Sequence, residues 1–291
     1  MKRDYLLLHL SVFLAGFTGV LGRLIALNEA VLVWYRMALS ALVLLGFLAT
    51  TKQFQRVDFK EIIKIAGTGV LLSFHWVFFY GSIKASNVSI GVVCFSLVCF
   101  FTALFEPIIN RHQFSIAQFL LSFLTLAGVY CIFQFDARYR LGIAMGLVSS
   151  ALYSLFAISN QRVGKQHDAK MMLFWELLGG LIALSAVMPL YLHFVPTDKF
   201  LPDGMDWCYM AFMVLVCTIG LYLLQIIALQ RIPAFTVNLT YNLEPVYSII
   251  LSLLIFQEHK DLNFSFGIGI ALIILSVVLQ TISEWKKTHV S

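Results

Sequence analysis

The chain has 291 residues, of which 60% are hydrophobic and 12% are charged, and its mean hydropathy is +0.88. Soluble globular domains carry about twice that share of charged residues, so the composition excludes a soluble fold and indicates an integral membrane protein. Only helices and closed barrels satisfy their backbone hydrogen bonds in lipid. The apolar runs are continuous rather than alternating, which favours helices over barrel strands. We predict an all-α membrane protein.

The apolar runs are long enough to cross a bilayer repeatedly, since a spanning helix needs about 20 mostly apolar residues. In chain order, the predicted transmembrane helices are 5–27, 31–49, 62–83, 88–109, 114–135, 141–160, 171–194, 207–230, 234–256 and 264–283. We therefore predict ten helices joined by short loops, with no room for a soluble domain.

The first segment follows Lys2 and Arg3, as a secretory signal does. Its apolar core is longer than that of a signal peptide, so we expect a retained helix. The five cysteines lie inside apolar segments without metal-ligand spacing and are expected to behave as small hydrophobic residues. No ATP-binding GxxxxGK[ST] loop is present in the sequence. We expect no metal and no cofactor.

The distribution of basic residues predicts the orientation, because lysine and arginine in short loops resist translocation. With the N-terminus inside, thirteen of the twenty basic residues fall on the inner side and five on the outer side, while Arg23 and Arg36 lie within helices. We predict a multi-pass protein of the cytoplasmic (inner) membrane with both termini cytoplasmic. The net charge of +5 mostly reflects this asymmetry, so we expect the lipid bilayer and no nucleic acid as a partner. The sequence favours neither a monomer nor a homo-oligomer.

Ten helices divide into two sets of five, and an odd number per set inverts the second set relative to the first. At an offset of 146 residues, the short joins at 84–87 and 110–113 meet those at 230–233 and 256–259. Loop positions match, although residue identity at that offset is poor. We predict two inverted repeats, 1–136 and 137–291, around a central cavity.

Three stretches carry characteristic motifs. Residues 228–279 contain Leu-Glu-Pro at 243–245 and Glu258, residues 81–132 contain LAGV at 126–129 near their end, and residues 34–45 read WYRMALSALVLL with Arg36 third. These stretches resemble the EamA-like branch of the drug/metabolite transporter superfamily, with Arg36 at the family's arginine position, and the resemblance covers nearly the whole chain. It implies ten helices in two inverted repeats around a central cavity, and transport of small metabolites, often amino acids outward.

The first half departs from the family pattern at two positions. The register that matches Glu244 and Pro245 holds Val98 and Cys99, whereas Glu106 and Pro107 come eight residues later. His112 stands where the family has a glutamate after the helix. Glu106 is therefore not expected to be the counterpart of Glu244.

Polar groups crowd the middle of segment 234–256, where Asn238, Tyr241, Asn242 and Glu244 precede Pro245. Proline lacks an amide donor and clashes with the carbonyl four residues back, that of Tyr241, so we predict a distorted turn there. Broken helices near the midplane build binding sites and hinges in transporters. We interpret these four residues as substrate-binding or coupling candidates and Pro245 as a hinge, against the alternative that the kink only shapes the bundle.

Other ionisable residues within helices are functional candidates because burying charge in lipid is costly. His75 either changes charge near neutral pH or bonds a neighbouring helix as a neutral ring. Arg36 either extends to the interface or faces the cavity as a counter-charge for a carboxylate. Glu176 is a partner of Arg36, a proton-coupling site or a residue that only holds the bundle together.

Two aromatic residues complete the set of candidates. Trp76 follows His75 and faces either the cavity or lipid, since it lies about 100 degrees further round the helix. Tyr153 offers a hydroxyl to a polar ligand, in a segment whose small residues also suit helix packing.

These features favour a secondary transporter that moves a small polar metabolite, an amino acid or a relative, outward by alternating access, with protons as a candidate coupling ion. The alternatives are a multidrug or nucleotide-sugar carrier, a channel and a membrane-embedded enzyme. An enzyme is disfavoured because neither HExxH nor a DxxD pair is present in the sequence.

We predict that Glu244→Gln impairs transport more than Glu106→Gln, because only Glu244 lies at the polar, proline-broken turn. Solute flux through each purified variant in proteoliposomes is the measurement. Equal rates for the two variants would contradict the assignment.

Overall fold

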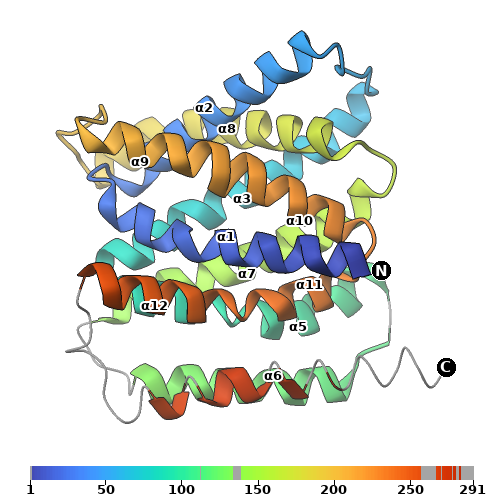
Figure 1. The fold of residues 1–291 in the computed structure, drawn as a ribbon, viewed down its shortest axis with the longest axis vertical. Helices are drawn as coiled ribbons and strands as arrows, with labels where there is room; N and C mark the ends of the chain where they lie inside the picture. Colours follow the sequence, from blue (N-terminus) through green and yellow to red (C-terminus); the bar gives the residue numbers. More distant parts are fainter. Residues whose placement is uncertain are drawn as a thin grey trace.

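The computed structural model describes residues 2–111, 113–133 and 139–256, together with 267–269, 271–276, 278, 279 and 282. Within these ranges the regular elements are helices, and no strand occurs. The helices lie side by side and run back and forth between two ends of the molecule (Figure 1). Eight helical stretches of the described chain are long and apolar enough to cross a membrane.

Each of the first nine predicted segments is helical over most of its length. The elements are α1 (Lys2–Leu24), α2 (Glu29–Thr50), α3 (Phe59–Ala85), α4 (Val88–Phe95), α5 (Val98–Asn110), α6 (Ile116–Phe133), α7 (Arg140–Gly164), α8 (Ala169–Phe194), α9 (Met205–Val214), η2 (Leu215–Gly220), α10 (Leu221–Leu229), α11 (Ala234–Tyr241) and α12 (Glu244–Phe256). Six spans match the prediction as single helices and carry no internal break: α1, α2, α3, α6, α7 and α8. The predicted helix 264–283 lies largely outside the described residues, as do Glu258 and His112, so the count of ten stays a prediction.

Polar side chains decide where several helices begin. The Asn28 side chain accepts a hydrogen bond from the Ala30 amide (2.9 Å), and Asn87 accepts one from Ile90 (2.8 Å). Asp58 and Asp168 cap α3 and α8 in the same way. Such caps satisfy amides that have no partner within the helix. The predicted segments began two to three residues later at α2, α3 and α8, because hydropathy locates the apolar part of a helix and not its polar first turn.

Two predicted helices are interrupted instead of continuous. Segment 88–109 divides into α4 and α5 at residues 96 and 97, and segment 234–256 divides into α11 and α12 at residues 242 and 243. At both breaks two successive amides bond three residues back: Ser96 and Leu97 to Val93 and Cys94, and Asn242 and Leu243 to Leu239 and Thr240. All these positions correspond at the offset of 146 residues.

The helix break before Pro245 was predicted, but the predicted cause, the proline, is only part of the explanation. Pro245 is the second residue of α12, where the missing amide hydrogen has no helical partner in any case. The equivalent break at residues 96 and 97 is followed by Val98 and Cys99 and needs no proline. Pro245 therefore begins a new helix rather than bending a continuous one, and the release of the Tyr241 carbonyl stays a prediction.

The eighth predicted segment, 207–230, contains another irregularity that the sequence did not predict. Between α9 and α10 the chain forms the π-helix η2 at Leu215–Gly220. A π-helical turn widens the helix and shifts the register of the residues that follow, and such turns occur frequently at functional sites. Cys217 and Thr218 of η2 are buried.

The tightest packing lies where α3 crosses α8. A Cβ atom at Gly69 would lie only 1.9 Å from the Glu176 carbonyl oxygen, and one at Gly179 would lie 2.6 Å from Ala66 Cα. Glycine at these positions lets the two backbones approach closely, as at small-residue interfaces in membranes. Gly180 belongs to the same crossing, since a Cβ atom there would lie 2.6 Å from the Gly69 carbonyl oxygen.

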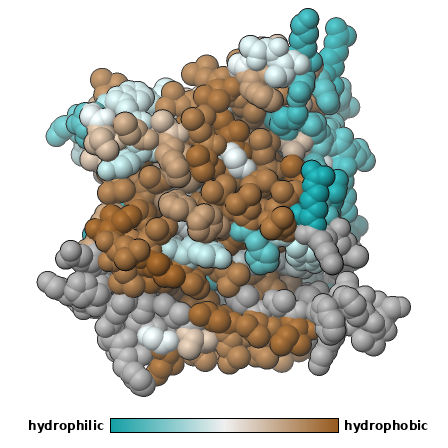
Figure 2. Space-filling model, viewed as in Figure 1, coloured by the Kyte–Doolittle hydropathy of each residue, from teal (hydrophilic) through white to brown (hydrophobic). Residues whose placement is uncertain are grey.

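The two ends of the bundle differ in charge. The end near the N-terminus, here called the basic face, carries exposed basic residues that include Lys60, Arg111, Arg162, Lys165 and Arg231. In Figure 2 strongly hydrophilic residues gather at the right-hand edge, the side on which Figure 1 marks the N-terminus, and an apolar surface covers the middle. The other end, here called the opposite face, carries the loop between α1 and α2 and the residues before α9.

We predict that Gly69→Ala lowers the free energy of unfolding by about 1–3 kcal/mol, the usual range for overpacking. The matched control is Gly46→Ala, since a Cβ at Gly46 meets no atom within 4 Å. The control is expected to be neutral or to stabilise by up to about 1 kcal/mol through helix propensity. Thermal unfolding of the detergent-solubilised variants checks this, and equal stabilities would be inconsistent with a close crossing.

Candidate functional site

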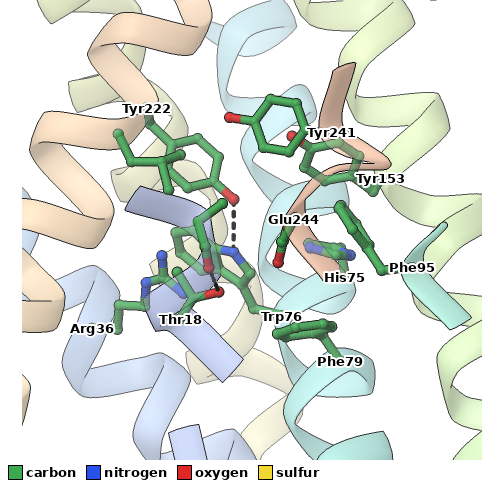
Figure 3. Close-up of a pocket in the computed structure, with 12 residues that line it drawn as sticks. Thr18, Arg36, His75, Trp76, Phe79, Phe95, Tyr153, Tyr222, Tyr241 and Glu244 are labelled. Carbon is green, nitrogen blue, oxygen red and sulfur yellow. Dashed lines mark hydrogen bonds between the residues drawn. The ribbon is translucent and has the colours of Figure 1, made fainter. Parts of the chain in front are cut away.

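A small cavity lies in the middle of the bundle, between helices from both halves of the chain (Figure 3). Its volume is about 20 Å³, which suits about one water molecule. The lining residues are Ala15, Thr18, Arg36, His75, Trp76, Phe79, Phe95, Tyr153, Leu221, Tyr222, Tyr241 and Glu244.

Arg36 of α2 is buried at the cavity wall with 1% of its surface exposed. Its guanidinium donates to Thr218 Oγ1 (2.8 Å), to the Cys217 carbonyl (2.8 Å) and to the Tyr80 hydroxyl (2.5 Å). Its central carbon also lies 3.7 Å from the centre of the Trp76 ring. This cation–π contact and the three hydrogen bonds hold the charge within the protein, so Arg36 does not extend to the interface.

The Trp76 indole forms one edge of the cavity and donates to the Tyr222 hydroxyl (2.9 Å). The two rings meet edge to face, with centres 5.2 Å apart. Trp76 thus faces the cavity and not the lipid. Residues 76 and 222 are separated by 146 positions, the offset at which the two helix breaks also correspond.

His75 is held in place by its contacts with α7. Its Nδ1 lies 3.0 Å from the Ser149 carbonyl and 2.9 Å from the Ser149 hydroxyl. A carbonyl only accepts, so Nδ1 carries the hydrogen, which leaves Nε2 as an acceptor in the neutral ring. The ring packs among Phe79, Phe95 and Tyr153. The contact with α7 matches the predicted bond to a neighbouring helix, while the ring also lines the cavity.

Glu244 is the first residue of α12 and has 3% of its surface exposed. Its carboxyl group lines the cavity that also contains Arg36 (Figure 3). Among the described residues no group donates a hydrogen bond to this carboxyl or forms an ion pair with it. The positive end of the α12 dipole favours negative charge at this position. Arg36 likewise has no carboxylate within ion-pair distance in the described chain, so the guanidinium and the Glu244 carboxyl are both available to a solute.

Two tyrosines complete the polar lining. Tyr153 of α7 accepts a hydrogen bond from Gln225 of α10 (2.5 Å), and Tyr241 of α11 donates to Ser11 of α1 (3.2 Å). Their ring centres lie 6.0 Å apart. The two hydroxyl contacts therefore join α7 to α10 and α11 to α1 at the cavity wall.

Three predicted candidates do not line the cavity. Glu176 is fully buried, and one of its oxygens accepts hydrogen bonds from Thr68 (2.8 Å) and Asn160 (2.5 Å). The suggested pairing of Glu176 with Arg36 is wrong, because these partners lie at the junction of α3, α7 and α8 while Arg36 contacts η2. Asn238 and Asn242 lie on the side of the cavity toward the basic face.

Several lining residues escaped the sequence analysis, chiefly Thr18, Phe79, Phe95 and Tyr222. Single aromatic and hydroxyl residues are too common in this chain to stand out. The offset of 146 residues could nevertheless have indicated some of them. Three pairs of lining residues are separated by 146 positions: His75 with Leu221, Trp76 with Tyr222, and Phe95 with Tyr241.

Polar contacts close the bundle at both ends. At the opposite face, Asp206 accepts from the Ala26 amide (3.1 Å) and from Lys199 (2.9 Å), and hydrogen bonds to Asp206 and Asp203 raise the pKa of Lys199 above its ordinary value. At the basic face, Arg231 pairs with Asp4 (3.0 Å). The structure therefore represents a state in which the cavity is closed.

The chain is similar to known proteins over nearly its whole length. A family model described as the EamA-like transporter family matches residues 2–134 and 140–282. An "Uncharacterized transporter" of Haemophilus influenzae is 23% identical over 285 residues, which cover 90% of this chain and 89% of the relative. A crystal structure described only as that of a protein has a TM-score of 0.69 at 15% identity and covers 97% of this chain and 98% of its own. This last likeness concerns the fold alone.

We predict that Arg36→Lys reduces the activity of the protein about tenfold or more, because lysine cannot reproduce the fork of hydrogen bonds and the stacking on Trp76. Arg23→Lys is the matched control, since Arg23 is exposed and its central carbon lies 5.0 Å from the Phe256 ring centre. Solute flux and thermal stability of both variants are the measurements. Equal activity of Arg36→Lys and Arg23→Lys would refute a role for the guanidinium in the cavity.

Proposed function

Since this chain belongs to the EamA-like transporter family, and so is a membrane transporter, we propose that it is a secondary carrier for a small polar metabolite. The solute is an amino acid or a related zwitterion, and the main direction is efflux. The carrier works by alternating access, because the closed cavity holds only about one water and must enlarge toward one face at a time.

The observation that carries the proposal is the presence of two opposite charges on one cavity. Arg36 has no carboxylate partner and Glu244 has no donor among the described residues. A zwitterion satisfies both at once, with its carboxylate on the Arg36 guanidinium and its ammonium group on the Glu244 carboxylate. An uncharged or singly charged solute leaves one of these buried charges without a partner, which is costly.

The aromatic lining supports a second candidate, a carrier of aromatic drug-like cations. Trp76, Phe79, Phe95, Tyr153 and Tyr222 offer ring faces around the Glu244 carboxylate, and ring faces attract cations. We rank this second, because the Arg36 charge opposes a purely cationic solute. The same rings also suit the side chain of an aromatic or apolar amino acid.

The proposal includes ten helices in two inverted repeats, with 1–136 as the first and 137–291 as the second. The correspondence of the helix breaks, of their hydrogen bonds and of the Trp76–Tyr222 contact at one offset supports it. The two separate family-model ranges also support it. Equivalent residues of two repeats meet only near the axis that relates them, and binding sites of such transporters lie at that interface.

The proposed location is the cytoplasmic membrane, with both termini and the basic face in the cytoplasm, in agreement with the excess of basic residues at that end. Pro245 is a proposed hinge, since it is the second residue of α12 and follows Glu244 of the cavity lining. Protons are the proposed coupling ion. A proton and the ammonium group of the solute compete for Glu244, which gives exchange between the two.

The deciding experiment is a flux assay in proteoliposomes with a panel of labelled amino acids, aromatic cations and nucleotide sugars, with and without a pH gradient. Zwitterions are expected to move and to be driven by the gradient. Movement of the cations alone favours the second candidate. If no solute of the panel moves under either condition, the carrier proposal fails.

We predict that Glu244→Gln abolishes the dependence of flux on the pH gradient, because the amide cannot exchange a proton. Glu176→Gln is the matched control, since Glu176 is a buried carboxyl outside the cavity and glutamine keeps an oxygen for Thr68 and Asn160. Uphill transport by both variants under a pH gradient is the measurement. Retained coupling in Glu244→Gln, with loss in Glu176→Gln, would reverse the assignment.

A further inference from the structure

A buried polar cluster lies between the central cavity and the basic face. Asn238 of α11 donates to Thr102 Oγ1 of α5 (2.8 Å), and the hydroxyls of Thr102 and Ser154 of α7 lie 2.9 Å apart. Thr102 gives its hydrogen to the Val98 carbonyl (2.7 Å), so it accepts from both neighbours. We call Thr102, Ser154, Asn238 and the adjoining Asn242 the polar seam, and all four are buried.

The polar seam has hydrogen-bonding capacity that the protein does not use. Asn238 Oδ1 is buried without a partner among the described residues, and Asn242 Nδ2 has no stronger acceptor there than the Cys99 thiol, whose sulfur accepts only weakly. Helices in membranes often bond each other through polar side chains, but a purely structural contact satisfies its groups, since an unpaired buried group costs about 1–3 kcal/mol. An unused acceptor and a weakly bonded donor one helical turn apart instead suit a passing solute or water.

The polar seam connects two hollow regions. On the cavity side, Tyr153 and Tyr241 are direct sequence neighbours of Ser154 and Asn242 and line the cavity. On the other side, a pocket of about 920 Å³ opens at the basic face between the ends of α5, α7 and the start of α11, where Asn110, Gln161 and Pro233 line it. On α7 the cavity, seam and pocket residues Tyr153, Ser154 and Gln161 follow each other within about two turns. On α5 the seam residue Thr102 lies about two turns before Asn110 of the pocket.

We propose that solute passes between the cavity and the basic face through the polar seam, which serves as a transit site for hydrogen-bonding groups. This rests on the proposed carrier function. In the closed state Thr102, Ser154 and Asn238 bond each other and join α5, α7 and α11. When these helices part, the same groups bond the solute, whose polar atoms are thereby accommodated within the membrane.

A counterpart lies on the other side of the cavity. Ser248 of α12 stands 146 positions after Thr102, and its hydroxyl donates to the Gly16 carbonyl of α1 (2.7 Å). A Cβ at Gly16 would lie 2.6 Å from Tyr247 Cβ, so α1 and α12 are packed closely here. Ser248 is satisfied within the protein, and it marks the equivalent closure toward the opposite face.

Cysteine labelling tests the passage with a near-isosteric pair, Ser154→Cys and Ser248→Cys. The parent protein carries Cys99→Ala, Cys131→Ser and Cys208→Ser, which remove the cysteine beside the seam and those that are not buried. A membrane-impermeant, charged methanethiosulfonate is applied to vesicles of either orientation. Lys165→Cys and Asp198→Cys, both exposed at opposite ends, report which face the reagent reaches.

The expected result is that Ser154→Cys reacts several-fold faster from the basic face than from the opposite face, and that Ser248→Cys shows the reverse. Labelled Ser154→Cys is also expected to lose solute flux. Thr102→Cys is a second reporter on another helix. The proposed passage is refuted if Ser154→Cys and Thr102→Cys do not react from either face, or react only from the opposite face.

A flux assay distinguishes failure of the carrier proposal from failure of the proposed passage. The parent protein is assayed for flux of the solute panel in the same preparation. Absence of flux by the parent refutes the carrier, whatever the labelling pattern. Flux by the parent, together with seam cysteines that stay unreactive, refutes the passage and leaves the carrier standing.

Discussion

A polar group buried within a bilayer has no water to bond, so it needs a partner inside the protein. Much of the architecture of this chain follows from that constraint. Asn28, Asn87 and Asp168 satisfy the first amides of α2, α4 and α8. The Arg36 guanidinium reaches η2 and α3 and stacks on Trp76. At Glu244 and in the polar seam, two of the places where a buried polar group lacks a full set of partners, the proposed solute supplies the missing hydrogen bonds.

The helix breaks are the second organising feature. A continuous helix satisfies its own backbone and presents only side chains to a cavity. At residues 96–97 and 242–243 the chain instead shifts to bonds three residues back, and the following helix starts with a new direction beside the cavity. The positive end of α12 then lies at Glu244 and favours its negative charge. Because the breaks lie at corresponding positions, each half has a similar interrupted helix beside the cavity. This suits the proposed alternating access, in which the two repeats exchange conformations.

Rigid and movable contacts are distributed unequally over the bundle. The α3–α8 crossing, where backbone atoms replace side chains at Gly69 and Gly179, leaves no space for sliding. Both ends also carry polar contacts, such as the Ala26 amide with Asp206 and Arg231 with Asp4, and exposed ion pairs contribute little to stability. These polar contacts are replaced readily by water, which suits the proposed alternating access.

The sequence by itself determined the class of protein, nine of the helical segments within a few residues and the position of the break before Pro245. These depend on local properties, namely hydropathy along the chain and the chemistry of proline. The sequence also selected Arg36, His75, Trp76, Tyr153, Tyr241 and Glu244, which the structure brings to one cavity. Only the tertiary structure separated Glu244 from Glu176, because both are single carboxyls in apolar helices and differ in what the neighbouring helices present to them. The break at residues 96–97, the π-helix at 215–220 and the meeting of Thr102, Ser154 and Asn238 were likewise decided by packing, since the face that each helix turns inward is set by its contacts with the others.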